Sequence, residues 1–444
     1  MGLVSQPETV HIPDDVWASD QLSPFLANLA AEHGPIFTFV PAGGPHRGQP
    51  VVYMVGPEAN RFVFLSGREH FSHDLGWTPV VGETLGHGLL NMDPPEHTRH
   101  RALMNPAFTT AFMAAYLPLM QRVIAERTAE WAEGSTIDLM TEAREITFDV
   151  AAAALVGFRT GPQVDWLRER FYTLLRGGPV SEREDWQTFV ERQLEVRDEL
   201  QAKLLELIAS RREATGDEQR AQDVLGMLVS ARDDDGRSLR DEQLLAHVNI
   251  LLVAGHETTT TLGAWVLYLL ARHSDYAARL DAELTGVLGE GPLTSDTLRN
   301  LPLLTAAIRE AGRLQSPVLL LPRGVLSDFE FAGRSVATGT HVFLAIAAGH
   351  RLASVFEAPE RFDPDRFLPP REEDRKSPYA LATFGGGPRI CLGINFAQVE
   401  VMALVAHVRR HVELVPISER PIPQYGGILP TLPEGIPMRI GSRR

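Results

Sequence analysis

The chain has 444 residues, of which 44% are hydrophobic and 22% are charged, an ordinary composition for a globular protein. The 57 acidic and 42 basic residues give a net charge of −15, which argues against nonspecific nucleic-acid binding because that binding needs positive surface. A single cysteine, the absence of a signal-peptide pattern over residues 1–20, and the lack of an apolar run of ~18 residues predict a cytoplasmic protein without disulfide or membrane anchor.

The first predicted elements are two short strands, residues 35–40 and 50–55, which flank a loop rich in Gly and Pro and so indicate a hairpin. Apolar residues at three- and four-residue spacing then predict helices over 106–133 and 182–213. The same pattern continues over 239–273. At 1.5 Å per residue this would be a helix of roughly 50 Å, long enough to cross the whole protein.

A second group of strands is expected between Gly324 and Ala347, where residues 329–331 and 342–344 enclose turn residues. The segment 416–437 is rich in Pro and Gly and predicts an ordered loop with short strands. No repeat or long linker is present. We therefore expect a mainly α fold with small β-sheets, built as a single domain over residues 1–444 around the long helix.

The only cysteine lies in a glycine-rich stretch, Phe384-Gly385-Gly386-Gly387-Pro388-Arg389-Ile390-Cys391-Leu392-Gly393, just before a helical pattern. Three glycines let the backbone bend closely around a bulky group, and a helix N-terminus favours a thiolate. One thiolate cannot hold zinc, which wants about four protein ligands, but it can hold a heme iron. The alternative is a buried, inert cysteine. The glycine run and Arg389 favour the metal ligand.

The long predicted helix contains an unusual polar segment, Ala254-Gly255-His256-Glu257-Thr258-Thr259. Adjacent threonines are poor helix formers, and a Thr hydroxyl can bond a carbonyl one turn back and open the helix locally. A carboxyl and a hydroxyl beside small residues suit proton delivery to iron-bound dioxygen. The alternative is a kink packed by small residues.

These two segments resemble the cytochrome P450 family, in its soluble bacterial form. Phe384, Gly387, Arg389, Cys391 and Gly393 match that family's heme-binding pattern Phe-x-x-Gly-x-Arg-x-Cys-x-Gly. The helix segment is similar to its oxygen-activating pattern, Ala/Gly-Gly-x-Asp/Glu-Thr-Thr. The resemblance implies that Cys391 is the iron ligand of heme b, that Phe384 packs near the sulfur and that Arg389 meets a propionate. It further implies that Glu257 and Thr258 relay protons, while Ala254 and Gly255 leave room for dioxygen and substrate.

The resemblance extends to charged residues elsewhere in the chain. It implies a buried structural network of Glu310, Arg313 and Arg361 beneath the heme, and further propionate contacts from His97, Arg101 and Arg323. In isolation, the His97 and Arg101 spacing would be read as two solvated residues of a first helical turn. One departure is that the family's Arg-Asp-Pro sequence is Arg351-Leu352-Ala353 here, which puts the local turn and its hydrogen bonds in doubt.

The implied activity is that of a monooxygenase, an oxidoreductase that inserts one oxygen atom from O2 into a substrate. By family layout the substrate pocket is apolar, so the substrate should be a fatty acid, terpenoid, steroid or polyketide. One cysteine cannot ligate an iron–sulfur cluster, so electrons should come from a separate ferredoxin or flavodoxin plus reductase, which would dock near arginines around the cysteine loop. Two alternatives stay open: a peroxide-using or isomerising heme-thiolate enzyme, and a non-catalytic heme-binding protein. The expected pocket residues are Leu89, Leu90, Leu252, Val253, Val318, Leu319 and Ile428, and the expected docking arginines are Arg99, Arg101, Arg389, Arg409 and Arg410.

Overall fold

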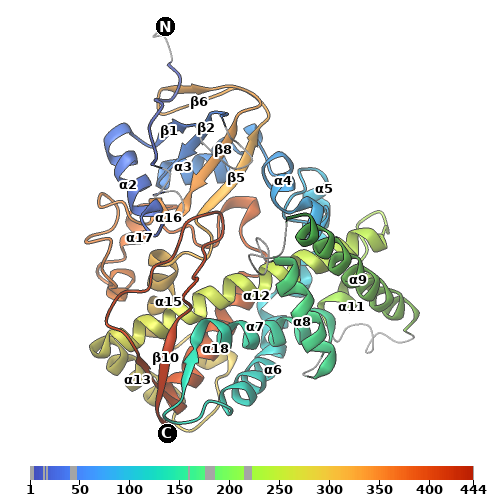
Figure 1. The fold of residues 1–444 in the computed structure, drawn as a ribbon, viewed down its shortest axis with the longest axis vertical. Coiled ribbons are helices and arrows are strands. Elements are labelled where there is room, and N and C mark those ends of the chain that lie inside the picture. The colour runs from blue at the N-terminus through green and yellow to red at the C-terminus, as the bar shows by residue number, and fades with distance from the viewer. Residues whose placement is uncertain are drawn as a thin grey trace. The chain divides into compact units, whose positions relative to one another are not determined.

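The computed structural model describes residues 5–13, 16, 19–40, 48–158, 161–175, 186–214 and 223–443. Helices make up 57% and strands 11%, which confirms the mainly α fold with small sheets (Figure 1). The chain forms two compact units that are interleaved in sequence, so the expected single domain over 1–444 stays a prediction. Unit 1 comprises Met1–Gly76, Met113–Arg144 and Thr258–Arg444, and unit 2 comprises Trp77–Phe112 and Glu145–Glu257.

The largest sheet of unit 1 has five strands in the order β1-β2-β8-β5-β3. Strand β1 pairs antiparallel with β2, with Ile36 opposite Met54, which confirms the expected hairpin; its residues 41–47 lie outside the described part of the chain. Strand β8 runs parallel to β2 and antiparallel to β5. The two strand groups expected from the sequence therefore join in one sheet. Its strands are β1 Ile36–Phe39, β2 Val51–Met54, β3 Phe71–Ser72, β5 Leu320–Val325 and β8 His341–Ala345.

Both faces of this sheet are buried, because alternate residues of each strand enter different hydrophobic clusters. Phe37 and Tyr53 stack with ring centroids 5.9 Å apart in the cluster that also contains α2 (Leu22–His33). Met54 and its neighbours enter the cluster on the other face, together with Phe64 and Phe329. Burial on both faces explains why these strands read as continuous apolar runs.

Two smaller sheets complete the strands of unit 1. Strand β10 (Pro437–Arg443) pairs with both β4 (Thr136–Asp138) and β9 (Val412–Pro416), and β6 (Phe329–Phe331) pairs with β7 (Arg334–Val336). In the segment expected to hold short strands, residues 416–437, the only internal pairing recorded is an isolated bridge between Tyr425 and Thr431. The strands lie at its two ends instead.

Unit 1 also contains helices, some of which contact these sheets. Helix α15 starts with Pro302 at its first turn, a position where proline loses no hydrogen bond, and buries most of its length. Helix α14 starts at a capping box made by Thr294 and Thr297. The helices are α2 Leu22–His33, α3 Pro57–Arg61, α6 Thr110–Thr128, α13 Ser274–Leu288, α14 Ser295–Leu298, α15 Pro302–Leu314, α16 Ile346–Gly349, α17 Glu373–Lys376 and α18 Ile394–His411.

Among its described residues, unit 2 contains helices and loops but no strand. Helices α8 and α9 pack against each other, and α9 packs against α11 (Figure 1). Asp223 caps α11, accepting a 2.7 Å hydrogen bond from the Gly226 amide, and pairs with Arg211 of α9 at 2.5 Å. Of the helix expected over 182–213, residues 186–213 form α9. Two of its helices, α4 and α7, begin in unit 1 and continue into unit 2. The helices are α4 Asp74–Leu85, α5 Glu96–Met104, α7 Leu139–Val156, α8 Pro162–Leu175, α9 Trp186–Glu213 and α11 Val224–Ser230.

The long helix α12 spans Asp241–Arg272, two residues inside the expected start and one inside the expected end. Its 32 residues cover about 48 Å at 1.5 Å per residue. Residues up to Glu257 belong to unit 2, and those from Thr258 belong to unit 1. Among the described residues, no helix is long and apolar enough to cross a membrane.

Candidate functional site

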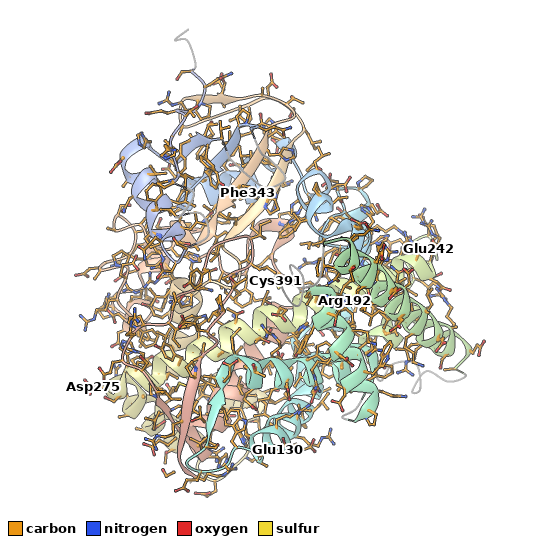
Figure 2. The ribbon with its side chains drawn as sticks, viewed as in Figure 1. Glu130, Arg192, Glu242, Asp275, Phe343 and Cys391 are labelled. Atoms are coloured by element: carbon orange, nitrogen blue, oxygen red, sulfur yellow. The ribbon has the colours of Figure 1, made fainter. Side chains whose placement is uncertain are left out.

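The cysteine loop, residues 384–393, leads into α18 in unit 1. A short 3₁₀ turn, Gly387–Arg389, is followed by Cys391, whose amide donates a 2.9 Å hydrogen bond to the Phe384 carbonyl. The Cys391 side chain is exposed, and Figure 2 labels it. Gly393 caps α18, so the sulfur-bearing residue lies two positions before the cap. The helix dipole and first free N–H groups act there to stabilise a thiolate.

Two glycines of the loop are required by close packing against Phe64, which lies in the π-helical turn Phe62–Ser66. Gly387 has φ +60°, and a Cβ there would lie 2.1 Å from the Phe64 carbonyl oxygen. A Cβ at Gly386 would lie 2.8 Å from the Phe64 ring. At Gly393, by contrast, a Cβ would meet nothing within 4 Å, so packing among the described residues does not require that glycine.

The donor set around Cys391 fits a heme and no ordinary protein metal site. Within the described ranges, no group of three or more His, Cys, Asp or Glu side chains could hold a metal ion. A lone thiolate therefore needs other ligands to complete a metal's coordination. A heme would bring most of the iron's ligands itself and would need only the Cys391 thiolate from the protein.

The start of the loop is held by buried polar contacts. The Ala382 amide donates to Nε2 of His350 at 2.9 Å, and the Thr383 hydroxyl donates to the Gly312 carbonyl at 3.4 Å. His350 is fully buried. Burial and then the positive charge of Arg313 lower the pKa of His350 to about 3. The ring is therefore neutral, and because its Nε2 accepts a hydrogen bond, its hydrogen is on Nδ1.

Below this loop lies a buried charge network centred on Glu310, which we call the Glu310 network: Glu310, Arg313, Arg366 and Glu373. Glu310 accepts hydrogen bonds from Arg313 at 2.7 and 2.9 Å and from Arg366 at 3.0 Å. Arg366 also donates to Glu373 at 2.7 Å. The side chains of Glu310, Arg313 and Arg366 are fully buried. Two negative and two positive charges therefore balance one another away from water.

The resemblance implied Arg361 as the third member of this network. In the structure, Arg366 takes that place instead. The Arg361 residue is exposed and contributes its carbonyl, which accepts from Arg313 at 3.3 Å. The sequence offers two similar tetrads, Pro359-Glu360-Arg361-Phe362 and Pro364-Asp365-Arg366-Phe367. Only the second places its arginine in the interior, since a 3₁₀ turn over Pro364–Phe367 turns Arg366 towards Glu310.

The departure at Arg351-Leu352-Ala353 does not disrupt the local turn. The Arg351 amide donates to the Ala348 carbonyl at 3.0 Å, and the Val355 amide donates to the Leu352 carbonyl at 3.0 Å. The Arg351 side chain pairs with Glu360 and donates to the Leu314 carbonyl. Leu352 is partly buried against the cluster around Phe37. Apolar packing thus occupies the place of the expected aspartate.

The acid and threonine of α12 lie on a stretch of the helix that is more open than the turns beside it. Ala254 is exposed, and Gly255, Glu257 and Thr258 are partly exposed, while Leu252 and Thr259 are buried. A Cβ at Gly255 would meet only Leu155, at 3.8 Å. A carboxyl and a hydroxyl therefore lie beside small residues on one accessible stretch, as oxygen activation would require.

The four expected propionate ligands are divided between the units. In unit 2, His97 is 4% exposed on α5, and Arg101 donates from Nε to the Asn105 side chain at 3.0 Å. In unit 1, Arg323 is 3% exposed on β5 and donates to the Pro322 carbonyl, and Arg389 ends the 3₁₀ turn before Cys391. Each unit therefore presents two basic residues.

The expected substrate-pocket residues are also divided. In unit 1, the Leu319 amide donates to the Ile428 carbonyl at 2.9 Å, which brings these two residues together, and Val318 is partly buried beside them. In unit 2, Leu252 is fully buried and Val253 is 9% exposed, while Leu89 and Leu90 are partly buried. A cleft of about 900 Å³ in unit 1 has Leu319 as its one lining residue from this set.

Three of the arginines expected to bind an electron donor have structural partners. Arg99 pairs with Asp233 at 2.6 Å, and Arg409 pairs with Asp281 through two hydrogen bonds of 2.9 and 2.6 Å. Arg410 donates to the carbonyls of residues 289 and 291. These contacts give Arg99, Arg409 and Arg410 roles within the fold, and their part in docking an electron donor stays a prediction.

The chain thus carries a cysteine on a glycine loop before a capped helix, with a supporting charge network, in unit 1, and an acid–threonine pair on the long helix α12. That combination defines the class of heme-thiolate monooxygenases. A sequence model of the cytochrome P450 family matches residues 15–435. The chain belongs to the cytochrome P450 family.

Individual relatives agree with this membership. The chain is 31% identical over 371 residues to a protein of Mycobacterium tuberculosis named putative cytochrome P450 136, covering 82% of this chain and 74% of that protein. It is 29% identical over 377 residues to a sterol 14α-demethylase of Mycolicibacterium vanbaalenii, covering 82% and 81%. Among solved structures, a cyanobacterial CYP120A1 described as bound to retinoic acid superposes with a TM-score of 0.84 at 26% identity, covering 99% of this chain and 100% of that one. The heme domain of a cytochrome P450DA has the same fold, with a TM-score of 0.87 at 22% identity.

Proposed function

We propose that this protein binds heme b through Cys391 and inserts one oxygen atom from O2 into a lipophilic substrate. The observation that carries the proposal is the cysteine loop: its sulfur is exposed, it precedes a capped helix, and no described protein group could complete a metal site with it. Cysteine ligation gives a heme iron the electron density that favours cleavage of the O–O bond.

Other residues of this chain would deliver protons, bind the heme propionates and support the cysteine loop. Glu257 and Thr258 would hold and pass protons beside the reacting oxygen, and Ala254 and Gly255 would leave space for it. His97, Arg101, Arg323 and Arg389 would neutralise the two propionates. Phe384 would pack beside the sulfur, and Gly387 would let the loop approach Phe64. The Glu310 network would hold the loop in place without taking part in the chemistry.

The substrate class follows from the apolar residues of the expected pocket and from the relatives. One relative is named a sterol 14α-demethylase, and one solved structure is described as bound to retinoic acid. Both molecules are lipophilic. We therefore propose a steroid, terpenoid, fatty acid or polyketide substrate in contact with Leu89, Leu90, Leu252, Val253, Val318, Leu319 and Ile428.

Electrons would come from a separate ferredoxin or flavodoxin with its reductase, because the single cysteine cannot ligate an iron–sulfur cluster. The cytoplasm is the compartment that the absence of disulfides favours.

The test has two parts. The reduced carbon monoxide complex should show the red-shifted Soret band of a thiolate ligand, and Cys391→Ser should abolish it; an unchanged band in that variant would refute the ligand assignment. Difference spectroscopy over a library of steroids, terpenoids, fatty acids and polyketides should then identify substrates. Hits should yield oxygenated products with NAD(P)H and redox partners. Product formation from peroxide alone would instead point to a peroxide-using enzyme.

A further inference from the structure

His256, which lies between Gly255 and Glu257 on α12, uses both nitrogens of its ring in contacts within unit 2. Its side chain is fully buried. Nδ1 lies 2.5 Å from the carbonyl oxygen of Leu252, one helical turn back. Nε2 lies 3.2 Å from Oε1 of Glu257, the acid expected to deliver protons. The ring therefore connects a fixed backbone acceptor to a catalytic carboxyl.

The first contact fixes the tautomer of the imidazole. A carbonyl oxygen can only accept a hydrogen bond, so Nδ1 must carry a hydrogen. A neutral ring with its hydrogen on Nδ1 presents a lone pair at Nε2. That lone pair would face a second lone pair on an ionised Glu257, a repulsive contact. The observed approach therefore requires one proton between Nε2 and Oε1, as imidazolium with carboxylate or as imidazole with carboxylic acid.

The surroundings favour a pair that holds this proton and is neutral overall. The edge of the imidazole meets Phe148 with ring centroids 5.0 Å apart, and Tyr172 lies at 6.0 Å. Asp149, which follows Phe148 on α7, is paired with Arg168 at 2.5 Å. Because His256 is fully buried, a pair without net charge avoids most of the desolvation cost that a single ion would carry there.

The rings of Phe148 and Tyr172 pack around His256, so Glu257 is the member of the pair that can contact water. The Glu257 side chain is 23% exposed, whereas that of His256 is not exposed at all. Any proton that enters or leaves the pair must therefore pass through the Glu257 carboxyl.

We propose that His256 is a positioning residue that shares a proton with Glu257. The shared proton keeps Glu257 supplied with a proton for oxygen activation. The inference rests on the proposed function. In the transfer, the Nε2–H bond breaks and an Oε1–H bond forms, with no change in the charge of the pair. When Glu257 passes the proton on, a neutral imidazole and a carboxylate remain. A proton from water then returns through the carboxyl to Nε2, and no electrons move.

The shared proton is tested by ¹⁵N NMR of histidine-labelled protein as the diamagnetic, reduced carbon monoxide complex. His256 is assigned by the signals lost in His256→Gln. The expected result is a hydrogen on Nδ1 in both proteins, with Nε2 protonated in the native protein and unprotonated in Glu257→Gln. A hydrogen on Nε2 alone, or an Nε2 signal that Glu257→Gln leaves unchanged, overturns the proposal.

A matched pair of variants tests the consequence for catalysis. In His256→Gln the amide can still donate to Glu257 but cannot give up its proton, and in His256→Asn the amide reaches only the Leu252 carbonyl. The measurement is the share of NAD(P)H converted to product rather than hydrogen peroxide, across pH. Both variants should lose about tenfold in that share and flatten its pH profile, less than the roughly 10²–10⁴ of a direct general acid.

If His256→Gln converts the native share of NAD(P)H to product, with the native pH dependence, a simple hydrogen bond to Glu257 is enough for catalysis. That result would overturn the proposal of a shared proton. Both variants should keep the thiolate-type carbon monoxide band, which shows that the fold and iron ligand are intact. If the native protein itself lacks that band, the proposed function fails instead. The NMR result on the His256 and Glu257 pair remains a separate measurement.

Discussion

Nε of Arg366 lies 3.0 Å from Oε1 of Glu310, and both side chains are fully buried. The same carboxylate accepts two hydrogen bonds from Arg313, whose own Nη1 donates to the His350 carbonyl at 2.8 Å. Nε2 of His350 in turn accepts a hydrogen bond from the amide of Ala382, two residues before the cysteine loop. A continuous chain of contacts thus runs from the Glu310 network to the loop that bears Cys391.

Replacing Arg366 should therefore be far more damaging than replacing Arg361. Arg366→Met takes one of two arginine partners from the buried Glu310, which keeps Arg313, and one from Glu373, which keeps Arg371. Losing a buried charged partner should cost about 3–5 kcal/mol in the free energy of unfolding. The matched control, Arg361→Met, removes an exposed side chain and should change it by less than about 0.5 kcal/mol. Denaturant titration measures both. Equal losses in the two variants would contradict the assignment of Arg366 to the network.

Gly387→Ala should disrupt the cysteine loop. The new Cβ would lie 2.1 Å from the Phe64 carbonyl oxygen, at a φ of +60° that L residues rarely adopt. We expect loss of most of the thiolate-type carbon monoxide band. Gly286→Ala is the control, because a Cβ within α13 meets nothing within 4 Å and should stabilise the helix by up to about 1 kcal/mol. A full band in Gly387→Ala would show that the loop tolerates displacement from Phe64.

His350 should make stability depend on pH. Its pKa is lowered from 6.5 to about 3 by burial, then by Arg313 and Arg351, so the unfolded chain binds a proton that the folded chain does not. Stability should fall as pH falls from 6.5 towards 3, by about 1.4 kcal/mol per pH unit for one proton. His350→Gln keeps an acceptor for the Ala382 amide and should remove this part of the slope. Unfolding titrations across that range, on both proteins, measure it. Identical slopes would contradict the prediction.

Glu400 of α18 is a buried acid that the proposed chemistry does not use. It is fully buried, no described group lies within hydrogen-bond distance of either carboxyl oxygen, and burial raises its pKa well above the usual value. The folded state therefore keeps a proton that the unfolded state releases, so this residue lowers stability as pH rises above 4.5. Glu400→Met should raise the free energy of unfolding by about 1–3 kcal/mol at neutral pH. A less stable Met variant would indicate that the carboxyl has a partner in solution.

Arg409 should matter for stability rather than for docking an electron donor. Its two hydrogen bonds with Asp281 join α18 to α13, and its side chain is 14% exposed. A double-mutant cycle of Arg409→Leu and Asp281→Asn should give a coupling of about 1 kcal/mol. Reduction by an acidic ferredoxin at low salt should be unchanged in Arg409→Leu. A large, salt-dependent loss of reduction in that variant would restore the docking role.

Much of the fold could be predicted from local sequence patterns. The hairpin of β1 and β2 and the helix α12 follow from apolar periodicity and glycine-rich turns, which act over a few residues. The pairing of β2 with β8 could not be predicted in this way, because it joins Val51 to His341 across most of the chain. The expected short strands over 416–437 failed for a related reason: strand pairing needs a partner, and only Tyr425 and Thr431 find one inside that segment.

The sequence by itself located the candidate heme loop. A lone cysteine after three glycines and before a helix admits few uses, and that constraint is local. Only the tertiary structure decided which arginine completes the Glu310 network. Arg361 and Arg366 occupy equivalent places in two nearly identical tetrads, and burial selects one of them. The same holds for His256: the sequence places it beside Glu257, but the carbonyl one turn back fixes its tautomer and so makes it a partner of the acid.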